Sequence, residues 1–391
     1  MPSKPPPKWL FGAAATYKYG LSHGLASRLL APIDRWQARR GQRHLKRFVG
    51  ITGSVGKSTA TMLAGALLKA QFRTITGVYL NAGRHPLRRV RKLREPTDYV
   101  VQELSGHMQG ALDNVLDALR IDVAVVTAVG LDHAAAFRSV DAVAAEKQRL
   151  VAAVPPEGVA CLNADDPLVR GMAAVARCRV VLYGTAPDAE LRAANLDASW
   201  PNRLSFDLIV GDVTRRVRTR FAGRITLPSI LAALAVVHAT GADLDRAIDT
   251  LASIEPLPNR LAPAAGPFGH DYLRDTYKAS LWSTRALIDD MASWGPVPRI
   301  LVLGDLSDTG NDGSRKYRGA LRVAAANCAL VIGVGLAAGQ ARRLAAAGEP
   351  NLAAASSLDE VRDLLRARPP SLVILKSNSK YPLDLLLEAQ P

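Results

Sequence analysis

The residues with the clearest chemical potential lie at positions 52–59, which read Thr-Gly-Ser-Val-Gly-Lys-Ser-Thr. An apolar segment that suits a strand precedes them, and a predicted helix follows them. The two glycines allow backbone N–H groups to point at phosphate oxygens, Lys57 can reach the outer phosphates, and the Ser58 hydroxyl can bind Mg²⁺. The spacing is a variant of the common P-loop, because Ile51 stands where that motif has a glycine. The pattern predicts a nucleotide triphosphate site made by Thr52, Gly53, Ser54, Val55, Gly56, Lys57, Ser58 and Thr59.

Two further apolar segments end on polar residues that suit the same site. Residues 98–105 carry Glu103 at the end of one predicted strand, and residues 122–133 carry His133 at the end of another. Ligands of parallel sheets collect at the carboxyl ends of the strands, so these side chains and the P-loop are expected to share one crevice. Lys147 follows on a predicted helix. Taken alone, Lys147 would be a solvated helix lysine and His133 a strand-end histidine without a ligand role.

Five segments in register resemble the Mur ligase superfamily, and most closely its MurF type. They are residues 52–59, 127–133, 162–167, 274–280 and 302–310. The resemblance extends over nearly all of residues 46–391. It implies an ATP-dependent, ADP-forming ligase that joins a carboxylate to an amine, such as an amino acid, through an acyl phosphate.

The resemblance also implies roles for individual residues. Ser58 and Glu103 match ligands of the Mg²⁺ that bridges the ATP phosphates, and His133 matches a ligand of a second Mg²⁺. Lys147 matches a lysine that is carbamylated in the family, which makes it an anionic oxygen ligand for that metal site. Arg260 stands where the family has an arginine near the γ-phosphate, and Asp275 where it has a contact to the nucleotide ribose. The implied catalytic set is Lys57, His133, Lys147, Arg260 and Lys278.

Departures from the family pattern bear on the substrates. The P-loop begins near residue 50, whereas MurF proteins carry a UDP-binding domain in front of it, which argues against a UDP-MurNAc-peptide substrate. Residues 225–229 lack the family's asparagines, so the nucleotide preference stays open, and residues 375–380 replace its Lys-Gly-Ser. We expect an anionic carboxylate on a cell-envelope or secondary-metabolite precursor and an amino-acid or amine co-substrate. Two alternatives remain, a poly-γ-glutamate synthase of the PgsB/CapB type and a nucleotide-binding scaffold without ligase activity.

The positive charge of the chain is concentrated at its front. Residues 1–95 contain 19 lysines and arginines against two acidic residues, while the rest of the chain has 31 basic and 33 acidic residues. Leucines, Ile33 and Trp36 recur at helical spacing over residues 21–36, which predicts a basic amphipathic helix. Residues 9–43 then either contact the membrane peripherally or dock on the ATPase domain. A second basic run, residues 88–94, is expected beside the crevice, where it would suit an anionic substrate.

Composition sets the remaining limits. Aromatic residues make up 5% of the chain and no nucleic-acid-reading motif occurs, so nucleic acid is not an expected partner. No apolar run reaches the roughly 18 residues that span a bilayer, and the first residues lack the design of a secretory signal. We therefore expect a cytoplasmic protein, either fully so or peripheral on the inner face of the membrane. Cys161, Cys178 and Cys328 have no paired spacing, which predicts free thiols without zinc.

The expected fold is α/β. A basic amphipathic N-terminal segment (1–45) precedes a P-loop parallel-sheet ATPase domain (46–255) and a smaller Rossmann-like C-terminal domain (256–391). A hairpin is expected over residues 204–218. The proline-rich residues 255–259 are a candidate hinge. Because the implied site residues lie on both sides of it, domain closure is expected to assemble the active site.

Overall fold

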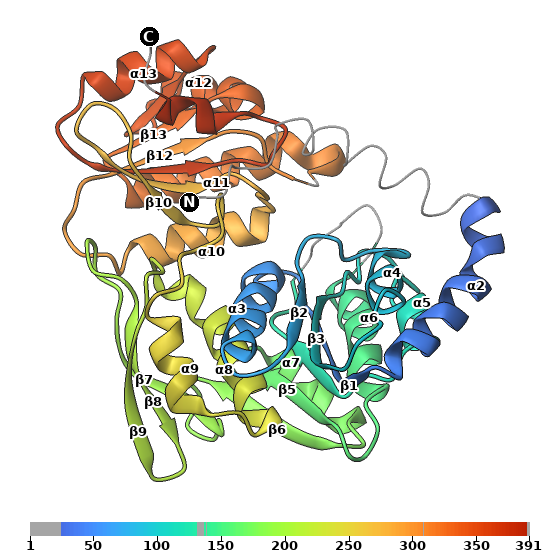
Figure 1. The fold of residues 1–391 in the computed structure, drawn as a ribbon. Helices are drawn as coiled ribbons and strands as arrows, with labels where there is room; N and C mark the ends of the chain where they lie inside the picture. The colour runs from blue at the N-terminus through green and yellow to red at the C-terminus, as the bar shows by residue number, and fades with distance from the viewer. Residues whose placement is uncertain (1–24, 131–136, 138, 308, 389–391) are drawn as a thin grey trace.

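The computed structural model describes residues 25–130, 137, 139–307 and 309–388. Two sheets that share no strand organise the molecule, and in Figure 1 the second sheet lies above the first. Helices cover both sheets, and each sheet is largely parallel. The α/β class predicted from the sequence is therefore confirmed.

The first sheet has nine strands in the order β2-β3-β1-β4-β5-β6-β7-β8-β9. The strands from β2 to β7 are parallel, and β8 and β9 add an antiparallel hairpin at one edge. Every residue of β4 and β5 is buried, which explains why these segments read as continuous apolar runs rather than alternating ones. The strands are β1 (Leu45–Thr52), β2 (Thr74–Gly77), β3 (Thr97–Glu103), β4 (Val123–Val126), β5 (Val159–Asn163), β6 (Arg179–Gly184), β7 (Leu191–Asp197), β8 (Ser205–Val210) and β9 (Val213–Arg218).

Two long helices form the centre of the layer on one face of this sheet. α3 (Lys57–Lys69) starts directly after the P-loop and packs against α8 (Leu227–Thr240). α8 is apolar nearly all round, and accordingly almost all of its residues are buried. The other helical segments of this part are α4 (His85–Val90), α5 (Asp113–Leu116), α6 (Val140–Ala152), α7 (Pro167–Gly171), η1 (Met172–Val175), η2 (Arg224–Thr226) and α9 (Leu244–Leu251).

The second sheet has six strands in the order β10-β11-β15-β12-β13-β14. All pairs are parallel except β10 with β11. The strands are β10 (Ala262–Ala264), β11 (Asp271–Asp275), β12 (Arg299–Leu303), β13 (Leu330–Gly333), β14 (Leu352–Ala354) and β15 (Leu372–Lys376). The helices are α10 (Leu281–Met291), η3 (Gly310–Asp312), α11 (Gly313–Asn327), η4 (Gly335–Ala337), α12 (Ala338–Ala346), α13 (Leu358–Arg366) and η5 (Leu383–Leu387).

The apolar strands and the hairpin expected from the sequence are present in the structure, and the three cysteines are free thiols as predicted. Five strands were not predicted from the sequence, namely β2, β7, β10, β11 and β14. These strands are short or only partly buried, so they lack a continuous apolar run. The domain boundaries at residues 45 and 255 and the hinge at residues 255–259 stay predictions.

Helix α2 (Leu25–Gln42) docks on the first sheet through small and polar residues. Asp34, Ala38 and Gly41 are buried and recur at spacings of four and three, which places them on one face of the helix. A Cβ atom on Gly41 would lie only 2.1 Å from the carbonyl oxygen of Val90. The helix therefore approaches the backbone after α4 at a distance that only glycine permits.

Polar contacts add to this docking. The Asp34 carboxylate forms ion pairs with Arg84 and, at 3.0 Å, with Arg91. The Gln42 side chain both donates to the Arg120 carbonyl (2.8 Å) and accepts from the Arg120 N–H (3.1 Å). Since a buried carboxylate needs paired cations, Asp34 fixes which face of α2 turns inward.

The docking of residues 34–42 agrees with the second of the two alternatives for the front segment. Ile33 and Trp36, which belong to the predicted apolar stripe, are exposed and do not take part in it. Residues 9–24, which belong to the same prediction, lie outside the described residues. In the described part of the chain, no helix is long and apolar enough to cross a membrane.

A leucine at position 41 should weaken this docking. In Gly41→Leu the new side chain collides with the Val90 carbonyl, so we expect the free energy of unfolding to fall by about 1–3 kcal/mol, as for other overpacked sites. Urea unfolding followed by circular dichroism measures this change. Gly339→Leu in α12 is the matched control, because a Cβ there meets no atom within 4 Å. Equal stability of the wild type and Gly41→Leu would show that α2 is not docked as described.

Candidate active site

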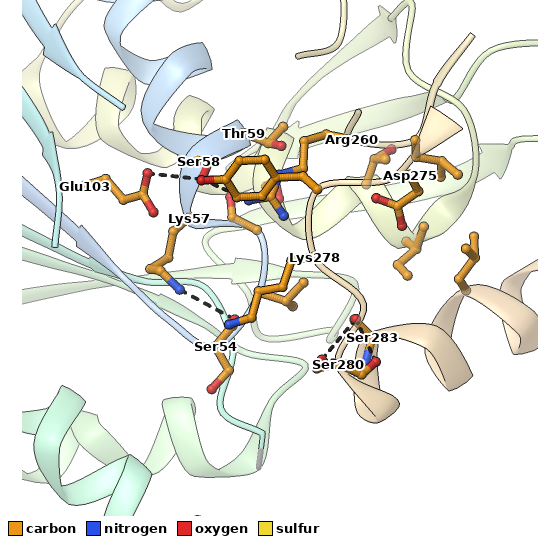
Figure 2. Close-up of a pocket in the computed structure, with 18 of the residues that line it drawn as sticks. Ser54, Lys57, Ser58, Thr59, Glu103, Arg260, Asp275, Lys278, Ser280 and Ser283 are labelled. Atoms are coloured by element: carbon orange, nitrogen blue, oxygen red, sulfur yellow. Dashed lines mark hydrogen bonds between the residues drawn. The ribbon is translucent and has the colours of Figure 1, made fainter. Parts of the chain in front are cut away.

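A crevice of about 270 Å³ lies where the carboxyl edge of the first sheet meets the second sheet. Figure 2 shows the P-loop with Glu103 on one side, and Arg260, Asp275 and Lys278 on the other. The predicted site residues that line it are Ser54, Val55, Gly56, Lys57, Ser58, Thr59, Glu103, Arg260, Asp275 and Lys278. The structure thus brings together residues separated by more than 200 positions in the chain.

The conformation of the P-loop requires both of its glycines. Gly53 has φ = 146° and Gly56 has φ = 82°, values that disfavour any residue with a side chain. A Cβ on Gly53 would lie 2.0 Å from Thr127 Oγ1, and one on Gly56 would lie 2.5 Å from Ser229 Oγ. Gly56 is also the N-cap of α3, so the free N–H groups of that helix start inside the crevice. The loop can therefore present backbone donors to an anion.

Lys57, the first residue of α3, extends over this loop. Its ammonium donates to the Gly53 carbonyl oxygen at 2.5 Å and lies 3.5 Å from that of Ser54. Figure 2 shows Lys278 reaching toward the same stretch from the opposite wall. Two cationic side chains thus converge on the loop from different sheets, as binding of an outer phosphate requires.

The Glu103 carboxylate is held by three donors. It accepts hydrogen bonds from Ser58 Oγ (3.0 Å), from the Tyr79 N–H (2.9 Å) and from Asn81 Nδ2 (2.5 Å), and only 2% of the residue is exposed. The predicted magnesium ligands Ser58 and Glu103 are therefore direct neighbours. Neither Tyr79 nor Asn81 was predicted from the sequence. Both follow β2, and because that strand lacks a continuous apolar run, no local pattern marked the loop after it as part of this edge of the sheet.

Arg260 lies on the side of the crevice that belongs to the second sheet, and its positively charged group reaches the Ser58–Glu103 pair. Its guanidinium lies 3.4 Å from Ser58 Oγ and 4.3 Å above the ring centre of Tyr277, whose ring in turn contacts that of Tyr79 at 5.0 Å. Its Nε is buried without a hydrogen-bond partner among the described residues. Burial raises the pKa of Tyr79 although Arg260 opposes that shift, so the phenol stays neutral beside the guanidinium. The stack holds Arg260 in place and leaves a buried donor for an anion.

Asp275 and a lysine form an ion pair in the wall of the crevice. They stand opposite each other on β11 and β15, and Lys376 Nζ lies 2.5 Å from Asp275 Oδ2 and 3.0 Å from the Lys278 carbonyl oxygen. Lys376 is only 1% exposed. The sequence analysis noted residues 375–380 as a departure but assigned Lys376 no role. Its position opposite Asp275 follows from strand pairing, which the sequence alone does not give.

The remaining predicted site residues lie elsewhere or cannot be described. Lys147 on α6 is buried and does not line the crevice, but a Cβ on Gly106 would lie 3.7 Å from its Nζ. Gly106 follows Ser105, which does line the crevice, so Lys147 stands directly behind the wall. Thr52 is buried beneath the loop and also does not line the crevice. His133 lies outside the described residues.

Part of the crevice wall is apolar with a few hydroxyl groups. It consists of Phe221, Ile225 and Leu287, together with Thr226 and Ser229. The hydroxyls already have acceptors inside the protein: that of Thr226 donates to the Gly223 carbonyl at 2.8 Å and that of Ser229 to the Gly56 carbonyl at 3.3 Å. This part of the wall suits a flat, partly apolar group such as a nucleobase, which it would recognise by shape more than by hydrogen bonds.

The basic run at residues 88–94 does not line this crevice, and only its beginning lies near it. Arg89 Nε donates to Gln102 Oε1 at 2.9 Å, next to Glu103 at the carboxyl end of β3. Residues 91–94 precede β3, which starts at Thr97, so this part of the run lies at the opposite edge of the sheet, contrary to our expectation. The positive charge of the crevice comes instead from Lys57, Arg260, Lys278 and Lys376, against two carboxylates, Glu103 and Asp275.

Comparisons with known proteins agree with this geometry. Residues 51–237 match the family model described as the Mur ligase middle domain. The UDP-N-acetylmuramoyl-tripeptide–D-alanyl-D-alanine ligase of Mycobacterium tuberculosis is 29% identical over 272 residues, which are 68% of this chain and 53% of that protein. The chain thus spans about half the length of this relative.

Two solved structures resemble the whole described fold. MurF from Acinetobacter baumannii has a TM-score of 0.80 at 22% identity, covering 92% of this chain and 79% of that one. MurF ligase from Thermotoga maritima in complex with ADP has a TM-score of 0.79 at 18% identity, covering 91% and 82%. At these identities the likeness establishes the fold. The match of residues 51–237 shows that this part of the chain is a Mur ligase middle domain, and the likeness to these structures shows that the described chain as a whole has the MurF fold.

Proposed function

We propose that this protein is an ATP-dependent, ADP-forming ligase that joins a carboxylate to an amine. The observation that carries the proposal is the meeting of the P-loop, the Ser58–Glu103 pair and Arg260 in one crevice between the two sheets. Relatives named as UDP-N-acetylmuramoyl-tripeptide–D-alanyl-D-alanine ligases support the same chemistry. An ADP-release assay across carboxylate and amine pairs tests the proposal.

ATP fits the crevice from its phosphates to its base. The N-terminus of α3 and the glycine conformations of the loop supply donors to the phosphates, and Lys57 adds a charge. The unpartnered Nε of Arg260 needs an acceptor, which a phosphate oxygen supplies. The apolar part of the wall with Phe221 and Leu287 accommodates the base. Asp275, held by Lys376, is the proposed contact to the ribose.

Mg²⁺ is the proposed cofactor. Among the described residues, no three or more His, Cys, Asp and Glu side chains cluster as a metal site. Mg²⁺ often takes only one or two carboxylates from the protein, with phosphate oxygens and waters completing its octahedron. Ser58 and Glu103 therefore suffice for a first ion that also binds ATP. We propose His133 and a carbamylated Lys147 as ligands of a second ion.

The protein's part in the reaction is mainly orientation and charge neutralisation. A substrate carboxylate oxygen attacks the γ-phosphorus and ADP leaves, after which the amine attacks the acyl carbon, phosphate departs and a proton is lost. Lys57, Arg260 and Lys278 line the crevice from different parts of the chain, and we propose that they surround the transferred phosphoryl group. Such fixed charges stabilise the transition state without the reorganisation that water would need.

The proposed substrates are an anionic carboxylate on a cell-envelope precursor and an amino acid or other amine. The relatives' names point to envelope precursors, and the excess of cationic over acidic groups in the crevice suits an anionic acceptor. We also propose that the enzyme works next to an anionic membrane face, because 19 basic residues stand against two acidic ones in residues 1–95.

Loss of the P-loop lysine should abolish turnover. Lys57→Ala removes a charge from the phosphate site, and we expect kcat for ADP release to fall by about 10²–10³. Lys69→Ala, an exposed lysine at the end of the same helix, is the matched control and should keep full activity. Normal turnover by Lys57→Ala would refute the nucleotide site. A wild type that binds ATP but releases no ADP with any pair would indicate the scaffold alternative instead.

The proposed carbamate makes a prediction with a chemical rescue. Lys147 is buried directly behind Ser105, so Lys147→Ala leaves a space in which a short carboxylate can replace the carbamate oxygens. We expect the variant to lose activity and to regain part of it in formate or acetate. Chloride at equal ionic strength is the control. Rescue by methylamine rather than by acetate would identify a plain ammonium at position 147 and contradict the carbamate.

A further inference from the structure

A second hollow lies at the amino edge of the first sheet, beneath the C-terminal half of α2. The residues that line it directly precede two neighbouring strands in the chain, β1, which begins at Leu45, and β3, which begins at Thr97. The crevice described above follows the opposite ends of these same strands. The polar and aromatic side chains around the hollow are Trp36, Gln37, Arg40, His44, Arg91, Lys92 and Arg94.

The hollow is cationic, and nearby acidic groups do not neutralise it. Asp34 is fully buried and already shared between two arginines, and the exposed Glu95 pairs with Arg73. No carboxylate of the described residues forms an ion pair with Arg40, Lys92 or Arg94, all of which are exposed. A concentration of exposed cations of this kind attracts an anionic surface.

An apolar ridge borders the same hollow. Ile33 is 51% exposed and Trp36 57% exposed, although both belong to a helix whose opposite face is firmly docked. With Arg40 they recur at spacings of three and four, so they share the outer face of α2. The Arg40 guanidinium lies 4.8 Å above the Trp36 ring. An exposed tryptophan beside cations is the composition that peripheral proteins place at the boundary of headgroups and acyl chains.

We propose that this surface, formed by Ile33, Trp36 and Arg40 of α2 and by residues 91–94, binds the anionic phospholipid face of a membrane. Headgroup phosphates occupy the hollow, while Ile33 and Trp36 enter the interfacial layer. A soluble phosphate would need no exposed apolar ridge, and a nucleic acid would gain nothing from an exposed isoleucine. The inference rests on the membrane location proposed above but not on ligase activity. Since the hollow and the crevice lie at opposite sheet edges, lipid binding leaves the crevice open.

Sedimentation of the full-length protein with vesicles tests the proposal. We expect binding to vesicles of phosphatidylcholine mixed with phosphatidylglycerol, and none to phosphatidylcholine alone. Each removed positive charge should weaken binding about fivefold, so Arg40→Glu with Lys92→Glu should weaken it at least about 25-fold. Trp36→Ser should also weaken it, through the lost apolar contact. The control is Val213→Ser with Arg218→Glu on β9, which removes an apolar side chain and reverses a charge at exposed positions on the edge strand of the same sheet. It should bind the anionic vesicles as the wild type does.

Four results would overturn the proposal. The first is that the wild type does not bind anionic vesicles, and the second is that Arg40→Glu with Lys92→Glu binds them as well as the wild type does. The third is that inorganic phosphate releases the protein from vesicles while Trp36→Ser binds normally. The fourth is that the protein binds single-stranded DNA more tightly than it binds vesicles. Undiminished binding would assign the contact to another part of the chain, and release by phosphate would identify a soluble-anion site. Circular dichroism checks that each variant is folded. ADP release is measured in parallel, so a protein without ligase activity that still binds vesicles separates the two proposals.

Discussion

The contact of Arg260 with Ser58 is the interaction on which the rest of the site depends. The contact joins the Arg260 guanidinium, which comes from the side of the second sheet, to the hydroxyl of Ser58, which follows Lys57 at the start of α3. A guanidinium held against Tyr277 with an unpartnered buried Nε is unfavourable unless an anion completes its hydrogen bonds. Glu103 and Asp275 already have donors of their own. A polyanion between the two sheets would supply the acceptor that Arg260 Nε lacks.

The site residues that could be located from the sequence lie in short contiguous segments. The strand, loop and helix around Lys57 are contiguous, and Glu103 ends a single apolar strand, so both could be predicted from local pattern. Asn81 and Lys376 could not be, because their roles depend on which strands are neighbours in a sheet. The docking face of α2 was also missed. A buried ion pair and a close backbone approach at Gly41 decided it, and hydrophobic periodicity detects neither.

Two different surfaces lie at opposite ends of the strands of the first sheet. At its carboxyl edge the loops converge on a crevice with fixed polar groups, while at its amino edge α2 and the turn before β3 present cations and an exposed tryptophan. Because Asp34 holds one face of α2 against the protein, the other face, with Ile33 and Trp36, is exposed to solvent. Docking through one face of α2 therefore leaves the other face exposed for the membrane contact that we propose.

The most direct test of this account is the affinity for a non-hydrolysable ATP analogue with Mg²⁺, measured by calorimetry for the wild type and Arg260→Met. Methionine retains much of the apolar stem but neither the charge nor the donors. A charged hydrogen bond contributes about 1.5–3 kcal/mol, so the account predicts a loss of affinity of about 10- to 150-fold. Arg246→Met, at an exposed position on α9, should bind like the wild type. Equal affinities of the wild type and Arg260→Met would contradict a nucleotide site shared by the two sheets.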